Sequence, residues 1–128
     1  MINENLKLSG QLNIVLKDKA GNVKDTVQVK NLVVNAGLAY IASRMTGTAK
    51  AVMSHMALGS GTTTAEATQT DLVSILGSRE ALDTTSISGS NSEKVVYEAA
   101  FEAGDATGAV TEAGIFNAAA AGASSVML

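Results

Sequence analysis

The chain has one histidine, His55, and no cysteine. An imidazole can act as a general base, but such catalysis also needs a nucleophile and an orienting carboxylate beside it. His55 lies in the alternating run 53–57, which is typical of a strand. The pattern therefore predicts a structural residue at the rim of a sheet. The missing thiols exclude cysteine nucleophiles, disulfides and thiolate metal sites.

Four carboxylates lie close in sequence, and they could converge across a hairpin over 95–116: Glu98, Glu102, Asp105 and Glu112. Paired carboxylates can hydrolyse glycosides, and a ring of carboxylate oxygens can hold calcium. No run matches an EF-hand loop, and acidic residues on antiparallel strands usually face water. The pattern favours a solvated face and leaves a bound divalent ion open.

Glu112 differs from the other acids because it lies inside an apolar strand predicted over 109–116. A buried carboxylate needs a partner, and Arg44 or Arg79 could form an ion pair with it that fixes strand order. An outward-facing strand position explains Glu112 equally well. Both interpretations are structural, so the sequence predicts no catalytic, cofactor-binding or metal-binding residue, no cofactor and no enzymatic activity.

The glycine-rich turn Gly59-Ser-Gly61 could be imagined as a phosphate loop. A P-loop needs a lysine just before its Ser or Thr, and a dinucleotide loop needs a helix directly after its glycines. The sequence has neither feature, so a tight turn after a strand is expected.

Charge and composition limit the partners. The net charge is −3 and the nine basic residues are scattered, which argues against nucleic acid. Four lysines gather near the N-terminus, but aspartates interrupt them, which is typical of a solvated hairpin face: Lys17, Lys19, Lys24 and Lys30 with Asp18 and Asp25. No run approaches the roughly 18 apolar residues of a membrane span, and the first residues lack signal-peptide order. A protein made in the cytoplasm, without a membrane partner, is expected.

The elements that must position these residues are mostly strands. Alternating apolar residues over 6–16, a turn at 18–22 and a return strand predict an N-terminal hairpin over 6–30. A helix is predicted over 36–46, with Asn35 as its N-cap and Gly47 just past its end. Its apolar face is expected to comprise Leu38, Ile41, Ala42 and Met45.

The remaining strands are expected within 52–128. The predicted strands cover 52–58, 94–101 and 109–116, and Thr70 could cap a short helix over 71–76. An exposed hairpin tip or a mobile loop is expected over 77–94, and a turn of small residues is expected over 118–125. With no Trp and no Pro, and 46% hydrophobic residues, the core must be aliphatic. The sum is one domain over 1–128, a mainly β, antiparallel β-sandwich of immunoglobulin-like or jelly-roll-like type with one short helix.

Several segments, in fixed order over about 10–117, resemble a family of small bacteriophage virion structural proteins, also similar to the attachment modules of tail fibres. The matching segments are KNLVVNAGL at 30–38, IASRM at 41–45, HMALGSGT at 55–62, QTDL at 69–72 with Arg79, VYEAAF at 96–101 and TEAGIFN at 111–117. Relatives continue for one or two more strands, so a sheet ending at 126–128 is expected to expose an unpaired apolar edge.

The resemblance implies a non-enzymatic part of a virion, present in many symmetric copies and made in the host bacterial cytoplasm. Its partners would be copies of itself and a tail, baseplate or major capsid protein, and a capsid decoration (cement) protein is the alternative. A carbohydrate-binding module is a further alternative, with only Tyr40 and Tyr97 as sugar-stacking platforms. A small hydrolase lacks a visible nucleophile–base pair in the sequence.

Overall fold

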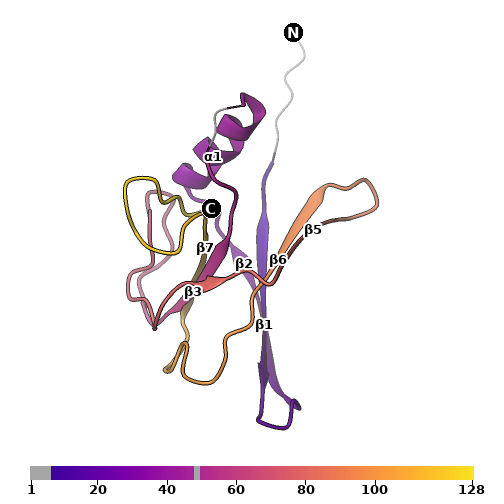
Figure 1. Cartoon of the computed structure of the whole chain (residues 1–128), viewed down its shortest axis with the longest axis vertical. Helices are drawn as coiled ribbons and strands as arrows, with labels where there is room; N and C mark the ends of the chain where they lie inside the picture. Colours follow the sequence, from indigo (N-terminus) through magenta and orange to yellow (C-terminus); the bar gives the residue numbers. More distant parts are fainter. Residues whose placement is uncertain (1–6, 48–49) are drawn as a thin grey trace. The chain divides into compact units, whose positions relative to one another are not determined.

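The computed structural model describes residues 7–47 and 50–128, and contacts divide the chain into two compact units that meet between Val33 and Val34. Paired strands in the described part are antiparallel, and they accompany one short α-helix (Figure 1). The predicted class, mainly β with antiparallel sheets and a helix near 36–46, is confirmed, and the sheets are compatible with a β-sandwich. The single domain over 1–128 stays a prediction.

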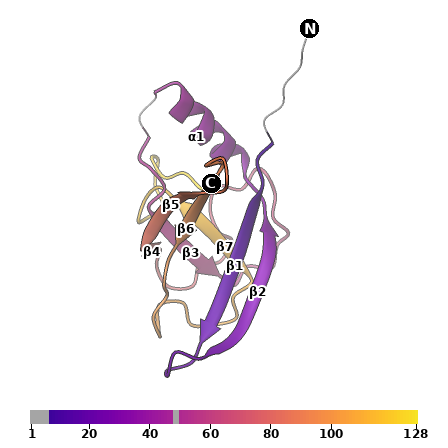
Figure 2. The ribbon, with the colours of Figure 1, turned by 90° about the vertical axis from the view of Figure 1, so that its right-hand side faces the viewer.

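The first unit is the hairpin of β1 (Gly10–Lys17) and β2 (Val23–Asn31), which confirms the hairpin predicted over 6–30 (Figure 2). Its turn forms because the Asp18 carboxylate accepts the N–H groups of Ala20 and Asn22, each at 2.9 Å, while Gly21 takes a φ of +84°. The N–H of Asn22 holds the pKa of the Asp18 carboxyl below its ordinary value. Leu6 and the rest of 1–6 lie outside the described residues.

The strand register sorts the hairpin into an apolar and a polar face. Leu12 lies opposite Val29 and Ile14 opposite Val27, whereas Gln11 and Asn13 lie opposite Lys30 and Gln28. Opposed residues in an antiparallel pair point to the same side. All four lysines expected on a solvated face are exposed: Lys17, Lys19, Lys24 and Lys30.

The second unit begins with α1 (Asn35–Met45), and two details of its prediction are wrong. The N-cap residue is Val34 and not Asn35. Asn35 is the first helical residue, and its backbone N–H donates to the carbonyl of Ala67 at 2.8 Å. The helix also buries a different face, with Gly37 and Tyr40 inward.

The expected apolar face of α1 is mostly exposed, since Leu38 is 44% and Met45 79% accessible and Ala42 is exposed, although Ile41 is half-buried. Gly37 explains why the helix buries a different face from the predicted one, because a Cβ at this position would lie 2.7 Å from the Leu128 backbone. The helix therefore packs against the backbone of Leu128 through Gly37, and not through Leu38. Gly47 does follow the helix end, with φ +75°.

Two further sheets complete the second unit. In the first, β3 (His55–Gly59) lies between β4 (Glu80–Ala81) and β7 (Glu112–Phe116). In the second, β5 (Thr84–Ser88) pairs with β6 (Lys94–Glu98), a hairpin that reaches away from the first sheet (Figure 1). Residues 77–94 thus include a hairpin tip, one of the two structures expected there. The hairpin expected over 95–116 is wrong, because β6 pairs with β5 and β7 with β3.

The short helix predicted over 71–76 is also wrong. The segment forms bends and one isolated antiparallel bridge, between Ile75 and Gly59, and there Leu76 N–H donates to the Leu58 carbonyl and Ser60 N–H to the Ser74 carbonyl. Val73 is consequently 52% exposed instead of facing inward.

The core of the second unit is small and mostly aliphatic. It consists of two clusters, one with Val34, Ala57, Phe116 and Met127 and one with Tyr40, Met53 and Val126. The apolar edge expected at 126–128 is wrong, because Val126 and Met127 are buried and Leu128 N–H donates to the Ile115 carbonyl. Over 7–47 and 50–128, no helix combines the length and apolarity that crossing a membrane requires.

Candidate functional site

The Glu112 carboxylate binds three backbone N–H groups from two other segments. Oε1 accepts from Gly61 at 3.0 Å and from Ser74 at 2.7 Å, and Oε2 accepts from Val73 at 3.0 Å. The predicted arginine partners and the predicted outward position are both wrong for this residue. An anion held by several amides is strongly hydrogen-bonded, so Glu112 joins β7 to the turn after β3 and to the 73–74 segment.

The glycines of the turn after β3 make room for this carboxylate. A Cβ at Gly59 or at Gly61 would lie 2.5 Å from Glu112 Oε1. The turn resembles a phosphate loop in that a backbone N–H of the turn points at an anion, but the anion belongs to the protein. The turn expected after the strand therefore binds a carboxylate of the protein itself, that of Glu112.

The other acids of the predicted carboxylate group have separate roles. Glu98 accepts the hydroxyl of Thr84, and the Asp105 carboxylate accepts the N–H of Glu102 at 2.8 Å. Among the described residues, no group of three or more His, Asp or Glu side chains could hold a metal ion. The four carboxylates therefore do not converge on one site.

Arg79 is the most heavily bonded cation in the described part of the chain. Its side chain is 3% exposed; it forms an ion pair with Asp71 at 3.1 Å and donates to the Ala118 carbonyl at 3.0 Å and to Ser125 Oγ at 2.8 Å. Its guanidinium carbon also lies 3.6 Å from the centre of the Phe116 ring. Arg79 thus fastens the 118–125 turn onto the core, and Arg44 merely donates to the Lys50 carbonyl.

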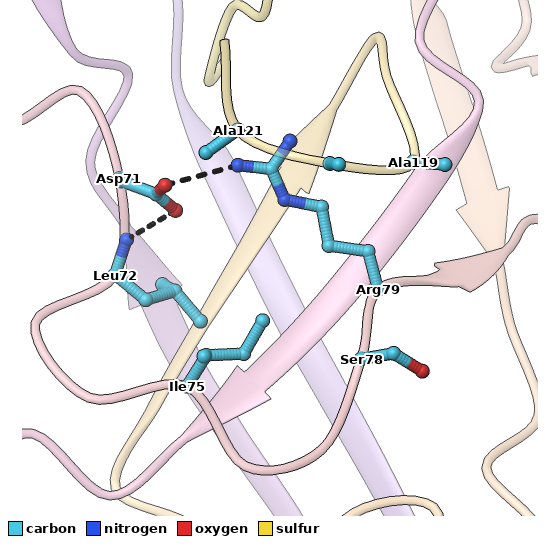
Figure 3. Close-up of a pocket in the computed structure, with 8 residues that line it drawn as sticks. Asp71, Leu72, Ile75, Ser78, Arg79, Ala119 and Ala121 are labelled. Atoms are coloured by element: carbon cyan, nitrogen blue, oxygen red, sulfur yellow. Dashed lines mark hydrogen bonds and ion pairs between the residues drawn. The ribbon is translucent and has the colours of Figure 1, made fainter.

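A pocket of about 230 Å³ opens beside Arg79, between the 71–79 segment and the alanines 119–121 (Figure 3). Its only ionisable side chains are Asp71 and Arg79, which pair with each other. The remaining lining is aliphatic or small, with the hydroxyl of Ser78 as a polar exception. The pocket therefore offers no free charge to a ligand.

A Ser–His pair is present that the sequence interpretation missed. Ser54 Oγ lies 2.7 Å from His55 Nδ1, at the start of β3. In the described part of the chain, no carboxylate is hydrogen-bonded to the imidazole. Adjacent residues can make this contact locally, and without an orienting acid the pair lacks the third member of a triad.

We expect this pair to contribute nothing to hydrolysis. Wild-type protein and the Ser54→Ala variant should release p-nitrophenol from a short-chain ester at the same rate, equal to that of buffer alone. A wild-type rate that exceeds the buffer rate and disappears in the variant would establish a hydrolase instead.

The two tyrosines considered as sugar platforms do not present open rings. Tyr40 is 8% exposed within the core, and Tyr97 is half-buried against the same cluster. Burial, with the nearby Tyr40, raises the pKa of the Tyr97 phenol above its ordinary value. Sugar stacking requires an accessible aromatic face, which these positions do not supply.

Exposed aliphatic side chains concentrate on the two hairpins. On β1 and β2, Val15, Leu16, Val23, Val27 and Val29 are between 42% and 59% accessible. On β5 and β6, Ile87 is 72%, Val95 56% and Val96 38% accessible. Each hairpin is a two-stranded sheet, so every one of these strands has a side without a ladder partner among the described residues.

In comparisons with known proteins, no family model, no curated protein and no solved structure matches the chain.

Proposed function

We propose that the chain is a non-enzymatic structural protein of a bacteriophage particle, which associates with copies of itself and docks on a tail or baseplate protein. The order of sequence segments described above motivates the virion assignment. The observation that carries the proposal is the pair of two-stranded hairpins with exposed aliphatic residues and unpaired sides. Such surfaces act through contact, not through chemistry.

Physical chemistry makes these hairpins unusual in a protein that acts alone. An isolated two-stranded hairpin is marginal in water, and stability normally requires a third strand or a packed face. Unpaired N–H and C=O groups along an edge also pair readily with another chain. A protein partner satisfies both needs, whereas nucleic acid would require clustered positive charge that a chain of net charge −3 does not supply.

Placement on the capsid as a decoration protein is the alternative within the same class. The small, acidic character of the chain supports it, and the resemblance to fibre-attachment modules supports the tail. The burial of Tyr40 and the partial burial of Tyr97 argue against a carbohydrate-binding module.

Purified particles of the phage whose genome encodes this chain test the proposal. We expect mass spectrometry to detect the chain in gradient-purified particles, and antibody labelling in electron micrographs to place it. A small, symmetric number of copies per particle would support placement on the tail, and hundreds of copies per particle would support placement on the capsid. Its absence from intact particles, with abundant free protein in the lysate, would contradict a virion role.

A further inference from the structure

Strand β6 has an unpaired side along its whole length. β5 is its only neighbour in the sheet, and residues 94–97 make no backbone hydrogen bond outside the β5–β6 ladder to any described residue. The strand carries valines at 56% and 38% exposure. It therefore combines free backbone groups with uncovered apolar side chains, the two properties that strand addition uses.

The sequence of β6, Lys-Val-Val-Tyr-Glu, is complementary to its own reverse. If two copies of the strand run antiparallel and are centred on Val96, each lysine faces a glutamate and each Val95 faces a Tyr97. Opposite charges and pairs of an aromatic with a β-branched residue are both favourable across strands. A contact of one surface with itself also requires this kind of self-complementarity.

We propose that two copies of the chain pair antiparallel through β6, with Val96 opposite the partner's Val96 and Lys94 opposite the partner's Glu98. The pairing joins the two hairpins into one four-stranded sheet in the order β5–β6–β6–β5. This inference rests on the self-association in the proposed function and specifies its edge and register.

The two faces of that sheet explain which residues become covered. Thr85, Ile87, Val95 and Tyr97 share one face by the β5–β6 register, and Tyr97 packs there against the Tyr40 cluster. Val95 of each copy would lie beside the partner's Tyr97. Pairing would thereby bury the exposed aliphatic side chains of the β5–β6 hairpin next to the cluster that contains Tyr40.

Two other free edges, those of β2 and β5, lack this complementarity. The same antiparallel arrangement of β2, centred on Val27, would place Lys24 opposite the partner's Lys30, a like-charge pair. On β5 it would place Thr84 opposite the partner's Ser88, so no charge would fix the register. Among these three edges, only β6 carries a charge pattern that selects its own copy.

Charge reversal on the full chain tests the register. Lys94→Glu and Glu98→Lys each place like charges opposite one another at both ends of the paired strands. Sedimentation velocity over a concentration series should show the dimer Kd raised by about tenfold or more in either variant. As a matched control, Glu102→Lys changes an exposed acid outside β6 and should leave the Kd unchanged.

Mixing the two single variants is the decisive step, because the Lys94→Glu chain opposes the Glu98→Lys chain with attractive pairs at both ends. We expect the mixture to form heterodimers with a Kd near that of wild type, which also shows that both variants are folded. The doubly reversed variant should likewise dimerise.

Three outcomes separate the claims. Restored association in the mixture supports the β6 register. Wild-type dimers that neither single variant weakens would overturn the register while leaving self-association intact. Wild-type protein that sediments as a monomer at every concentration would overturn both the register and the self-association in the proposed function.

Discussion

Replacement of Glu112 with alanine is expected to lower the free energy of unfolding by about 3 kcal/mol, since hydrogen bonds to a charged group contribute about 1.5–3 kcal/mol each and these are not additive. The three N–H groups of Gly61, Val73 and Ser74 would lose their shared acceptor. Urea unfolding followed by circular dichroism measures the loss.

Two matched variants show whether the carboxylate itself is responsible. Glu112→Gln keeps one acceptor oxygen and should lose roughly half as much stability. Glu66→Ala removes an exposed acid whose carboxylate bonds no described residue, and its effect should stay within about 0.5 kcal/mol. Equal effects of Glu112→Ala and Glu66→Ala would contradict the structural role of Glu112.

The glycine beside this carboxylate should behave as part of the same unit. A Cβ at Gly61 meets both Glu112 Oε1 and the Val73 side chain, so Gly61→Ala displaces the carboxylate and should also destabilise the fold. Because both substitutions break the same bonds, the Gly61→Ala/Glu112→Ala double variant should lose clearly less than the sum of the single losses. Additive losses would show that the glycine and the carboxylate act separately.

Replacement of Arg79 with alanine is expected to cost about 3 kcal/mol, since it removes a buried guanidinium with three hydrogen bonds, and hydrogen bonds to a charged group contribute about 1.5–3 kcal/mol each without being additive. The change leaves Asp71 Oδ2 and the Ala118 carbonyl without the guanidinium donor and opens space over the Phe116 ring. Thermal unfolding followed by calorimetry measures the loss.

Arg79→Lys and Arg44→Ala are the controls for this prediction. Lysine keeps the charge but lacks the planar fork, so it should recover only part of the lost stability. Arg44 is exposed and donates to one carbonyl, so its loss should cost less than about 0.5 kcal/mol. An Arg79→Ala variant as stable as Arg44→Ala would show that Arg79 does not hold the 118–125 turn.

The features that the sequence predicts well are local ones. The N-terminal hairpin follows from alternation on each strand and from a turn whose aspartate bonds its own backbone. The position of the helix follows from spacing and from Gly47 beyond its end. Both signals lie within a few residues, and here no contact that is distant in sequence overrides them.

The wrong predictions depend on contacts that are distant in sequence. Leu72, Val73 and Leu76 have helical spacing, but the amides of Val73 and Ser74 bind Glu112 instead. The helix face is set by Gly37 against Leu128. Arg79 pairs with nearby Asp71 and also bonds the distant Ala118 carbonyl and Ser125 hydroxyl, and no sequence pattern favours these partners over Glu112. In each case the partner lies in a segment that sequence patterns do not bring together.

Hydrogen–deuterium exchange, on the free chain diluted below its dimer Kd and on the chain in purified particles, tests most directly whether a partner covers these hairpins in the particle. Amides on unpaired strand sides exchange rapidly unless a partner covers them. We expect peptides that contain β6 and the β1–β2 hairpin to exchange at least about tenfold more slowly in particles than in the free chain. Peptides from β3 serve as the internal reference. Identical exchange of these hairpins in both states would contradict the account.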